Sequence, residues 1–300
     1  MSPKVSVIIN TRNSMRFFRQ AINSVWRQSL EDFEVIVWDH ASNDGLADYI
    51  ATLEDARLRF FVDHQSQSLQ EVRRRAIEVS TGDYVAFLDA DDTWLETKLE
   101  AQIQSFEQTS VACACSSYWL DAQGLTRSAS RSVFRSYSQP YVSRSEVIAN
   151  YRVGFSTLML DGAIARELMP RYQGRYRFVE DLDLVQLMLQ EGVLASEWRP
   201  LGTYRLHENN ASRDIEALLT ERDQWLETVQ EPTQDGALAK AFSRFRDETA
   251  SLRARRAFGS GQYRGAFQSL TAIRSQRTRI ECVGLVALAA LGVSRARLDF

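Results

Sequence analysis

The feature that most constrains the fold is a regular alternation between continuously apolar runs and amphipathic helical patterns up to residue 119. Runs such as 33–39 have no polar face, which is typical of strands buried on both sides of a parallel sheet. Strands that alternate with helices predict a doubly wound, Rossmann-like α/β fold, with a mostly parallel sheet and flanking helices. The expected strands are 4–10, 33–39, 58–63, 83–89 and 111–119, and the expected helices are 17–26, 46–53, 69–79 and 95–106.

The rest of the chain divides into a continuation of this pattern and a helical end. Residues 124–145 are rich in Ser and Arg and predict a loop over the candidate site, and a helical pattern returns at 181–190. We therefore predict a main domain over 1–209 and a small α-helical C-terminal region over 210–300. The helices expected in that region are 215–230, 237–258, 263–273 and 282–291.

Composition narrows the class of protein. Three Cys and three His among 300 residues argue against a disulfide framework and against a zinc site, since no His stands at ligand spacing from a Cys. The first residues lack signal-peptide architecture, and the longest apolar stretch, 283–293, is too short to cross a bilayer. These features predict a cytoplasmic protein.

The C-terminal region is basic, because residues from 241 onward include 11 Arg and only 4 acidic residues. A basic end beside an acidic body predicts contact with an anionic surface, with a solvated helix face as the alternative. The arginines do not alternate with aromatic residues on a recognisable nucleic-acid module. We therefore expect no nucleic-acid partner, and instead peripheral contact with the inner face of a membrane.

Polar side chains gather where three predicted strands end. The segments 10–13, 39–45 and 89–92 each follow an apolar run directly. Because the carboxyl ends of neighbouring parallel strands meet at one edge of the sheet, we expect these segments to form a single ligand site.

The acidic segment Asp89-Ala90-Asp91-Asp92 is the most specific of the three. Closely spaced carboxylates repel one another unless a cation lies among them, and hard oxygen ligands suit Mg²⁺ or Mn²⁺. Asp92 has another explanation, since Thr93 and Glu96 predict a capping box that opens the next helix. That explanation does not account for Asp89 or Asp91, so we expect a divalent cation there.

Five segments in order carry a resemblance to a known family. They are 5–13 (VSVIINTRN), 33–39 (FEVIVWD), 82–92 (GDYVAFLDADD), 180–184 (EDLDL) and 204–207 (YRLH). Together they resemble the signatures of inverting, GT-A-fold glycosyltransferases of family 2, over about residues 4–210. The resemblance implies a donor sugar linked to UDP, GDP or dTDP and a glycan, lipid-linked or protein acceptor. It also implies a role in the assembly of a bacterial-type polysaccharide, glycolipid or glycoprotein glycan.

The resemblance also implies roles for individual residues. Asp181 matches the catalytic base, with Glu180 as its substitute and a helix cap as the alternative role. Asp91 and His207 match the metal position, although His207 also fits a structural histidine. Arg73 matches a recurring arginine near the nucleotide, with a solvated helix face as its alternative. The residues matched to the nucleotide sugar are Thr11, Arg12, Asn13, Asp39, Arg73, Asp89 and Ala90.

Two departures from the family pattern leave the donor nucleotide open. Arg12 stands where the family has a tyrosine that lies against the base, and His40 replaces the usual second acid. Two other classes therefore remain as alternatives. One is a haloacid dehalogenase-type phosphatase with Asp89 as nucleophile, and the other is a non-catalytic nucleotide-sugar-binding protein.

Overall fold

A computed structural model describes residues 2–65, 68–107, 110–122, 131–173, 176–208, 210, 214–229, 235–276 and 278–283. The chain forms two compact units, which we describe separately. The first unit comprises residues 1–144 and 152–213, and the second comprises 145–151 and 214–300. The functional division at residues 209 and 210 stays a prediction.

The first unit is built on one mixed sheet with ten strands among the described residues. The strand order is β3-β2-β1-β4-β9-β6-β10-β5, with β7 paired to β6 and β8 paired to β10. The four strands β3, β2, β1 and β4 are mutually parallel, and β6 is parallel to β10. The short β9 separates these groups and runs antiparallel to both β4 and β6. The strands are β1 (Val5–Thr11), β2 (Phe33–Asp39), β3 (Leu58–Val62), β4 (Tyr84–Asp89), β5 (Thr93–Trp94), β6 (Val111–Asp121), β7 (Arg131–Phe134), β8 (Tyr141–Val142), β9 (Met159–Asp161) and β10 (Val193–Arg205).

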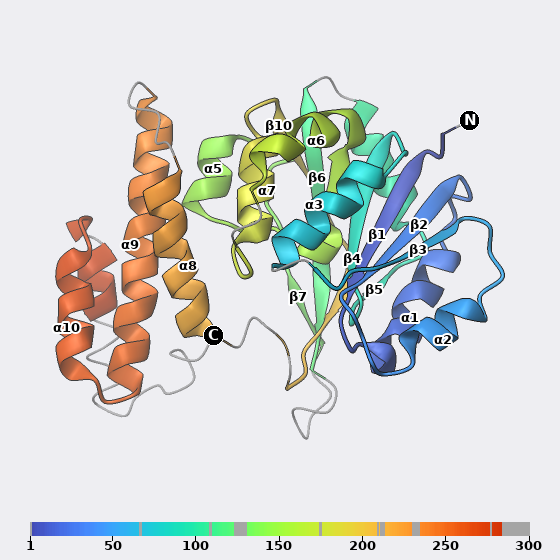
Figure 1. Cartoon of the computed structure of the whole chain (residues 1–300). Helices are drawn as coiled ribbons and strands as arrows, with labels where there is room; N and C mark the ends of the chain where they lie inside the picture. The colour runs from blue at the N-terminus through green and yellow to red at the C-terminus, as the bar shows by residue number, and fades with distance from the viewer. Residues whose placement is uncertain are drawn as a thin grey trace. The chain divides into compact units, whose positions relative to one another are not determined.

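Helices lie on both faces of this sheet (Figure 1). The helix α3 contacts β1 and β2, and α6 contacts β4. The helices α1, α2 and α4 contribute to the core on the opposite face. The predicted α/β fold with a mostly parallel sheet is therefore confirmed. The helices are α1 (Met15–Trp26), α2 (Leu46–Ala51), α3 (Leu69–Val79), α4 (Lys98–Ile103), α6 (Gly162–Leu168) and α7 (Glu180–Met188), with 3₁₀ turns at Gln104–Glu107, Phe155–Thr157 and Met169–Arg171.

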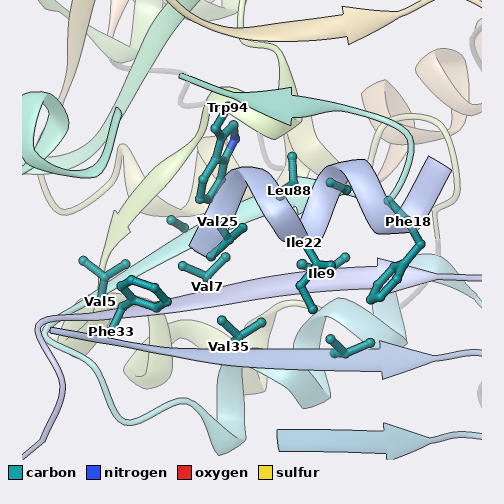
Figure 2. Close-up of a cluster of buried hydrophobic side chains, with 14 of the residues drawn as sticks. Val5, Val7, Ile9, Phe18, Ile22, Val25, Phe33, Val35, Leu88 and Trp94 are labelled. Atoms are coloured by element: carbon teal, nitrogen blue, oxygen red, sulfur yellow. The ribbon is translucent and has the colours of Figure 1, made fainter. Parts of the chain in front are cut away.

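The alternation of side chains along each strand decides which residues reach the core and which reach the site. Alternate residues of β1 point toward α1, where apolar residues recur at helical spacing (Figure 2). In β4 the same rule directs Leu88 to this core and the next residue, Asp89, to the α3 face. The buried residues of this core that Figure 2 labels are Val5, Val7, Ile9, Phe18, Ile22, Val25, Phe33, Val35, Leu88 and Trp94.

The structure differs from the sequence prediction mainly after β4. Residues 93–94 form β5 instead of the start of a helix, and α4 begins only at Lys98, so the predicted capping box does not exist. Part of the expected loop 124–145 forms β7 and β8, while residues 123–130 lie outside the described residues. The strands β9 and β10 were not predicted, because both owe their conformation to pairing with distant strands.

The second unit is helical in its described residues. Its helices are α5 (Arg144–Ala149), whose first residue belongs to the first unit, α8 (Ile215–Thr228), α9 (Gly236–Gly259) and α10 (Tyr263–Ala272). Trp225 of α8 packs against Phe242 and Phe245 of α9. The prediction of helices beyond residue 210 is confirmed for α8, α9 and α10, whereas most of 282–291 lies outside the described residues. Among the described helices, none has both the length and the apolar character that a membrane span needs.

Candidate active site

The loops that follow β1 and β2 are joined by side-chain hydrogen bonds. The backbone N–H of Asn13 donates to Ser42 Oγ at 2.7 Å, and Asn13 Oδ1 accepts from the N–H of Asn43 at 2.9 Å. Asn13 adopts a positive φ of 51°, a conformation that asparagine tolerates better than most residues. Asp39 accepts from the N–H of Ser42 at 3.0 Å and from its hydroxyl. These hydrogen bonds therefore hold together the two segments that are predicted to bind the nucleotide.

Buried polar atoms at the end of β1 have unused hydrogen-bonding capacity. Thr11 is 5% exposed and Asn10 is 8% exposed, yet Thr11 Oγ1 and Asn10 Nδ2 have no hydrogen-bond partner among the described residues. Such atoms are costly unless a partner arrives, so they are suited to a polar ligand. Arg12 is exposed beside them, and Asp39 is 2% exposed.

Arg73 lies at the centre of the charged network. Its guanidinium donates to Asp89 Oδ1 at 3.0 Å and to Glu180 Oε1, and lies 3.4 Å from the ring centre of Phe155. Arg73 is 2% exposed, so the alternative of a solvated helix face is wrong. The ring and the two carboxylates fix the plane of the guanidinium, with one edge on the tip of β4 and the other on α7.

Burial and neighbouring charges shift the pKa values of Arg73 and of the carboxyl groups around it. Burial lowers the pKa of Arg73, but Glu180, Asp89 and Asp181 raise it overall through their negative charges. Burial raises the pKa of Glu180 to about 8, against the opposing effect of Arg73 and with a further increase from Asp181. One guanidinium thus serves several carboxyl groups, and its attraction does not offset the cost of burying the charge of Glu180.

Asp91 and His207 meet across 116 residues of sequence. The His207 Nε2 and Asp91 Oδ2 atoms are 2.8 Å apart, and both side chains are partly exposed. The backbone N–H of His207 donates to Asn210 Oδ1, and Asn210 Nδ2 donates to the backbone carbonyl of Arg205 at 3.0 Å. The loop after β10 therefore fixes the position of this histidine. Ala90, which precedes Asp91, is 4% exposed.

Asp91 and His207 together suit a divalent cation that also binds oxygen atoms of a ligand. A carboxylate oxygen and an imidazole nitrogen are both ligands for Mn²⁺, and Mg²⁺ commonly binds one or two carboxylates together with phosphate oxygens. Within the described residues, no group of three or more His, Cys, Asp or Glu side chains could hold a metal. The donor set fits a cation held jointly by the protein and a bound diphosphate.

Asp92 does not open a helix, contrary to the prediction. It is 1% exposed, and its carboxylate accepts from Ser156 Oγ at 2.5 Å and from the N–H of Arg205 at 2.9 Å. Ser156 Oγ also accepts from the N–H of Asp89 at 3.1 Å. Asp92 therefore ties the tip of β4 to the end of β10, two residues before His207.

The first turn of α7 carries the two candidate bases. Asp181 is partly exposed, and its Oδ1 accepts from the N–H of Leu182 at 2.7 Å. Val179 holds the N-cap position of α7, so Asp181 is not the cap that the alternative expected. The side chain of Glu180 is 8% exposed and bound to Arg73. A base must reach the hydroxyl group it deprotonates, so Asp181 is the better placed of the two.

Two residues of this region were missed by the sequence analysis. Asp63 is 5% exposed at the end of β3, where it accepts from Arg75 Nη1 at 3.1 Å. The rule that found the other strand-end residues would have found it. Gln70 accepts from the N–H of Tyr176 at 2.8 Å and donates to Asp183 Oδ2 at 2.9 Å, which links α3 to both sides of the start of α7. No local pattern marks a glutamine for that contact.

Comparisons with known proteins identify the family of this chain. The family model described as glycosyl transferase family 2 matches residues 6–163. The TuaG protein of Bacillus subtilis (strain 168), a putative teichuronic acid biosynthesis glycosyltransferase, is 30% identical over 70% of this chain and 82% of its own length. WfaP of Escherichia coli, a UDP-Glc:α-D-GlcNAc-diphosphoundecaprenol β-1,3-glucosyltransferase, is 26% identical over 69% of this chain and 79% of its own.

Solved structures show the same fold. TarS 1–349 of S. aureus, in complex with UDP-GlcNAc, superposes with a TM-score of 0.63 at 15% identity and covers 97% of this chain and 88% of its own. The mannosyltransferase PcManGT of Pyrobaculum calidifontis, in complex with GDP-Man and Mn²⁺, gives 0.61 at 16% identity, over 98% and 82% of the two chains. These findings do not favour the phosphatase or the non-catalytic alternative. The chain belongs to glycosyltransferase family 2 and is an enzyme that transfers sugars.

Proposed function

We propose that the protein transfers a sugar from a nucleotide-diphosphate donor to a hydroxyl group of a glycan acceptor, with inversion at the anomeric carbon. The observation that carries the proposal is the gathering of Asp89, Asp91 and His207 at one sheet edge, joined through Arg73 to the helix that presents Asp181. The acceptor classes are a glycan, a lipid-linked sugar or a protein. WfaP, named for a diphosphoundecaprenol acceptor, favours the lipid-linked class and a role in polysaccharide or glycolipid assembly.

The loops after β1 and β2 bind the nucleotide in this proposal. Thr11 and Asp39 hold the base and ribose, with Asn13 fixing the loop and Arg12 at the exposed side. Structural neighbours bound to UDP-GlcNAc and to GDP-Man support a nucleotide-sugar donor, and dTDP remains within the proposed set. The two departures at Arg12 and His40 lie at this end of the site and bear on the choice of base.

The diphosphate lies at the tip of β4, beside Asp89 and Ala90. Asp91 and His207 would hold Mn²⁺ or Mg²⁺ there, and PcManGT, which has Mn²⁺ bound, supports a metal of this kind. When bound, the cation neutralises negative charge on the diphosphate leaving group. Arg73 holds Asp89 in place and adds a fixed positive charge near the same point.

Asp181 acts as the general base. It accepts the proton of the acceptor hydroxyl while that oxygen forms a bond to the anomeric carbon and the bond to the nucleotide diphosphate breaks. Attack from the side opposite the leaving group inverts the configuration. Glu180 is the substitute base, but its ion pair with Arg73 makes a positioning role more suitable.

The protein works at the inner face of the membrane in this proposal. The described part of the basic C-terminal region includes Arg264, Arg274 and Arg279 with exposed Tyr263 and Phe267. Basic and aromatic side chains together favour contact with an anionic lipid surface, where a lipid-linked acceptor resides.

The test is the Asp181→Asn variant. Asparagine keeps the size of the side chain but cannot accept the proton, so transfer should fall about 10²- to 10⁴-fold. Donor binding should survive, measured as thermal stabilisation by a panel of UDP-, GDP- and dTDP-sugars with and without Mn²⁺. Glu180→Gln is the matched control and should lose less activity. Turnover retained by Asp181→Asn, or a wild-type protein stabilised by no nucleotide sugar, would contradict the proposal.

A further inference from the structure

Three aromatic rings form a row across the strands of the half of the sheet that contains β6 and β10. The ring of Tyr118 on β6 stacks on Phe134 of β7 at a centroid distance of 4.9 Å and an interplanar angle of 19°. On its other side Tyr118 meets Tyr204 of β10 at 6.0 Å. All three residues are partly exposed, whereas an aromatic cluster that only fills a core would be buried. We call these three residues the aromatic row.

The pairing of the strands places the aromatic row beside the tip of β4. Gly202 of β10 pairs with Tyr118 on one side and with Trp94 of β5 on the other, and Thr203 pairs with Thr93, which follows Asp92. Tyr204 therefore lies one residue beyond these pairs, toward the strand ends where Arg205 meets Asp92. The aromatic row stands at the same edge of the sheet as the proposed diphosphate site.

The position of Tyr118 is closely determined. A Cβ atom on Gly154 would lie 2.6 Å from Tyr118 Cε1, so the glycine permits the ring to pack directly against the backbone before the 3₁₀ turn Phe155–Thr157. That turn carries Ser156, the partner of Asp92, and Phe155, the ring under Arg73. The segment from Gly154 to Thr157 therefore contacts both the aromatic row and the charged residues around Arg73.

Asp181 stands in the first turn of α7, and this helix contacts β6, the strand of Tyr118. Burial raises the pKa of Tyr118, and Tyr204, Asp92 and Asp181 add to the increase. Asp181 also acts on Arg73 through its charge. The helix that carries the candidate base is therefore bound to Arg73 through Glu180 and packs against the strand that carries Tyr118.

We propose that Phe134, Tyr118 and Tyr204 form the platform on which the acceptor sugar stacks, so that its hydroxyl group faces Asp181. This inference rests on the proposed function. A pyranose ring has an apolar face that packs on aromatic rings and hydroxyl groups that need hydrogen-bond partners at its rim. The Tyr118 hydroxyl forms no hydrogen bond to any described residue and supplies such a partner. The occupant is a pyranose, and a nucleobase is the competing occupant to be distinguished.

The test measures binding of a probe and of the donor separately. The probe is octyl β-D-N-acetylglucosaminide, observed by saturation-transfer NMR on the full-length protein loaded with UDP and Mn²⁺. Irradiation of the aromatic protons should transfer saturation to the pyranose protons of the probe. Phe134→Leu, on the partly exposed strand β7, should weaken the probe about tenfold, and Tyr118→Phe should weaken it less because the ring remains. The matched control is Trp198→Leu, which removes a 68% exposed aromatic from the same strand as Tyr204 and should change nothing.

The outcomes separate this inference from the proposed function. Nucleotide-sugar stabilisation and donor hydrolysis should stay within about twofold of wild type in Phe134→Leu, and unchanged thermal unfolding would show that the variant folds. Absence of saturation transfer in the wild type, or unchanged probe binding in Phe134→Leu, overturns the inference and leaves the proposed function standing. If Phe134→Leu loses affinity for the nucleotide instead of the probe, the inference is also overturned, because the aromatic row would then bind the nucleobase. Failure of the wild type to bind any nucleotide sugar counts against the proposed function instead.

Discussion

The two halves of the sheet carry different chemistry at the same edge. The parallel half, β3-β2-β1-β4, ends in carboxylates and amides, and each acidic side chain there is held by a defined donor such as Ser42 or Arg73. The mixed half, around β6 and β10, ends in the aromatic row. Acidic groups at the tip of β4 join the two halves, since Asp91 contacts His207 and Asp92 accepts from the backbone N–H of Arg205. If the proposed roles hold, stabilisation of the leaving group and binding of the acceptor sugar can be changed separately, because different halves of the sheet supply them.

The largest effect is expected when the charge at the centre of the parallel half is removed. Arg73→Met keeps the volume but leaves Asp89 without its counter-charge and the buried Glu180 without its hydrogen-bond donor, which should lower the free energy of unfolding by about 3–5 kcal/mol. Urea denaturation measures the loss. The control is Arg74→Met, whose ion pair with Glu78 lies on the exposed side of the same helix and should contribute under about 0.5 kcal/mol. Equal losses in the two variants would contradict the central role of Arg73.

The Asp92→Asn variant tests the contacts that connect the two halves of the sheet. In asparagine one of the two accepting oxygens becomes an NH₂ group, which only donates, so either Ser156 or the N–H of Arg205 loses its acceptor and the protein should lose about 1–3 kcal/mol. Because Arg205 precedes His207 by two residues, the Mn²⁺ concentration needed for half-maximal donor hydrolysis should rise as well. Asp83→Asn, which breaks only the exposed pair with Lys4, should leave both quantities unchanged. A stability loss without any change in the Mn²⁺ requirement would limit Asp92 to a structural role.

The pH dependence of stability sharpens the description of the parallel half. Burial holds the pKa of Glu180 at about 8, above the ordinary value of 4.5, so the folded protein keeps a proton that the unfolded chain has released. This contribution to stability is complete below pH 4.5 and is lost as the pH rises toward about 8. Glu180→Gln should therefore flatten the decline in unfolding free energy over that window. An unchanged slope in urea titrations at several pH values would assign the decline to other groups.

The smallest effects on stability and binding are expected at Arg12, in the loop that we propose binds the nucleotide. Arg12→Ala removes an exposed side chain and should change stability by less than about 0.5 kcal/mol. If the guanidinium stacks on the base, nucleotide affinity should fall a few-fold while probe binding at the aromatic row stays the same. Calorimetric titration with UDP and GDP measures this. An effect on the probe but not on the nucleotide would place Arg12 in the other half.

Prediction from sequence succeeded where local pattern and pairing agree. The strand Phe33–Asp39 and the helix Leu69–Val79 were predicted with the bounds observed, because both have unambiguous periodicity and buried surroundings. Prediction failed at Thr93, where a good capping sequence forms β5 through its contact with β10. It also missed β10, whose thirteen residues mix Gly, Pro and charged groups and become a strand by pairing with β6.

Local sequence patterns are enough to predict the parallel strands, the position of the acidic segment at the end of β4 and the family to which the chain belongs. These follow from spacing within short segments, which a single chain displays directly. Three features follow only from the packing of the folded chain: Arg73 is buried against Glu180, 107 residues away, Asp92 is bound to β10, and three aromatic residues from β6, β7 and β10 contact one another. Those contacts depend on long-range packing, in which residues distant in sequence acquire their role from the neighbours that the fold supplies.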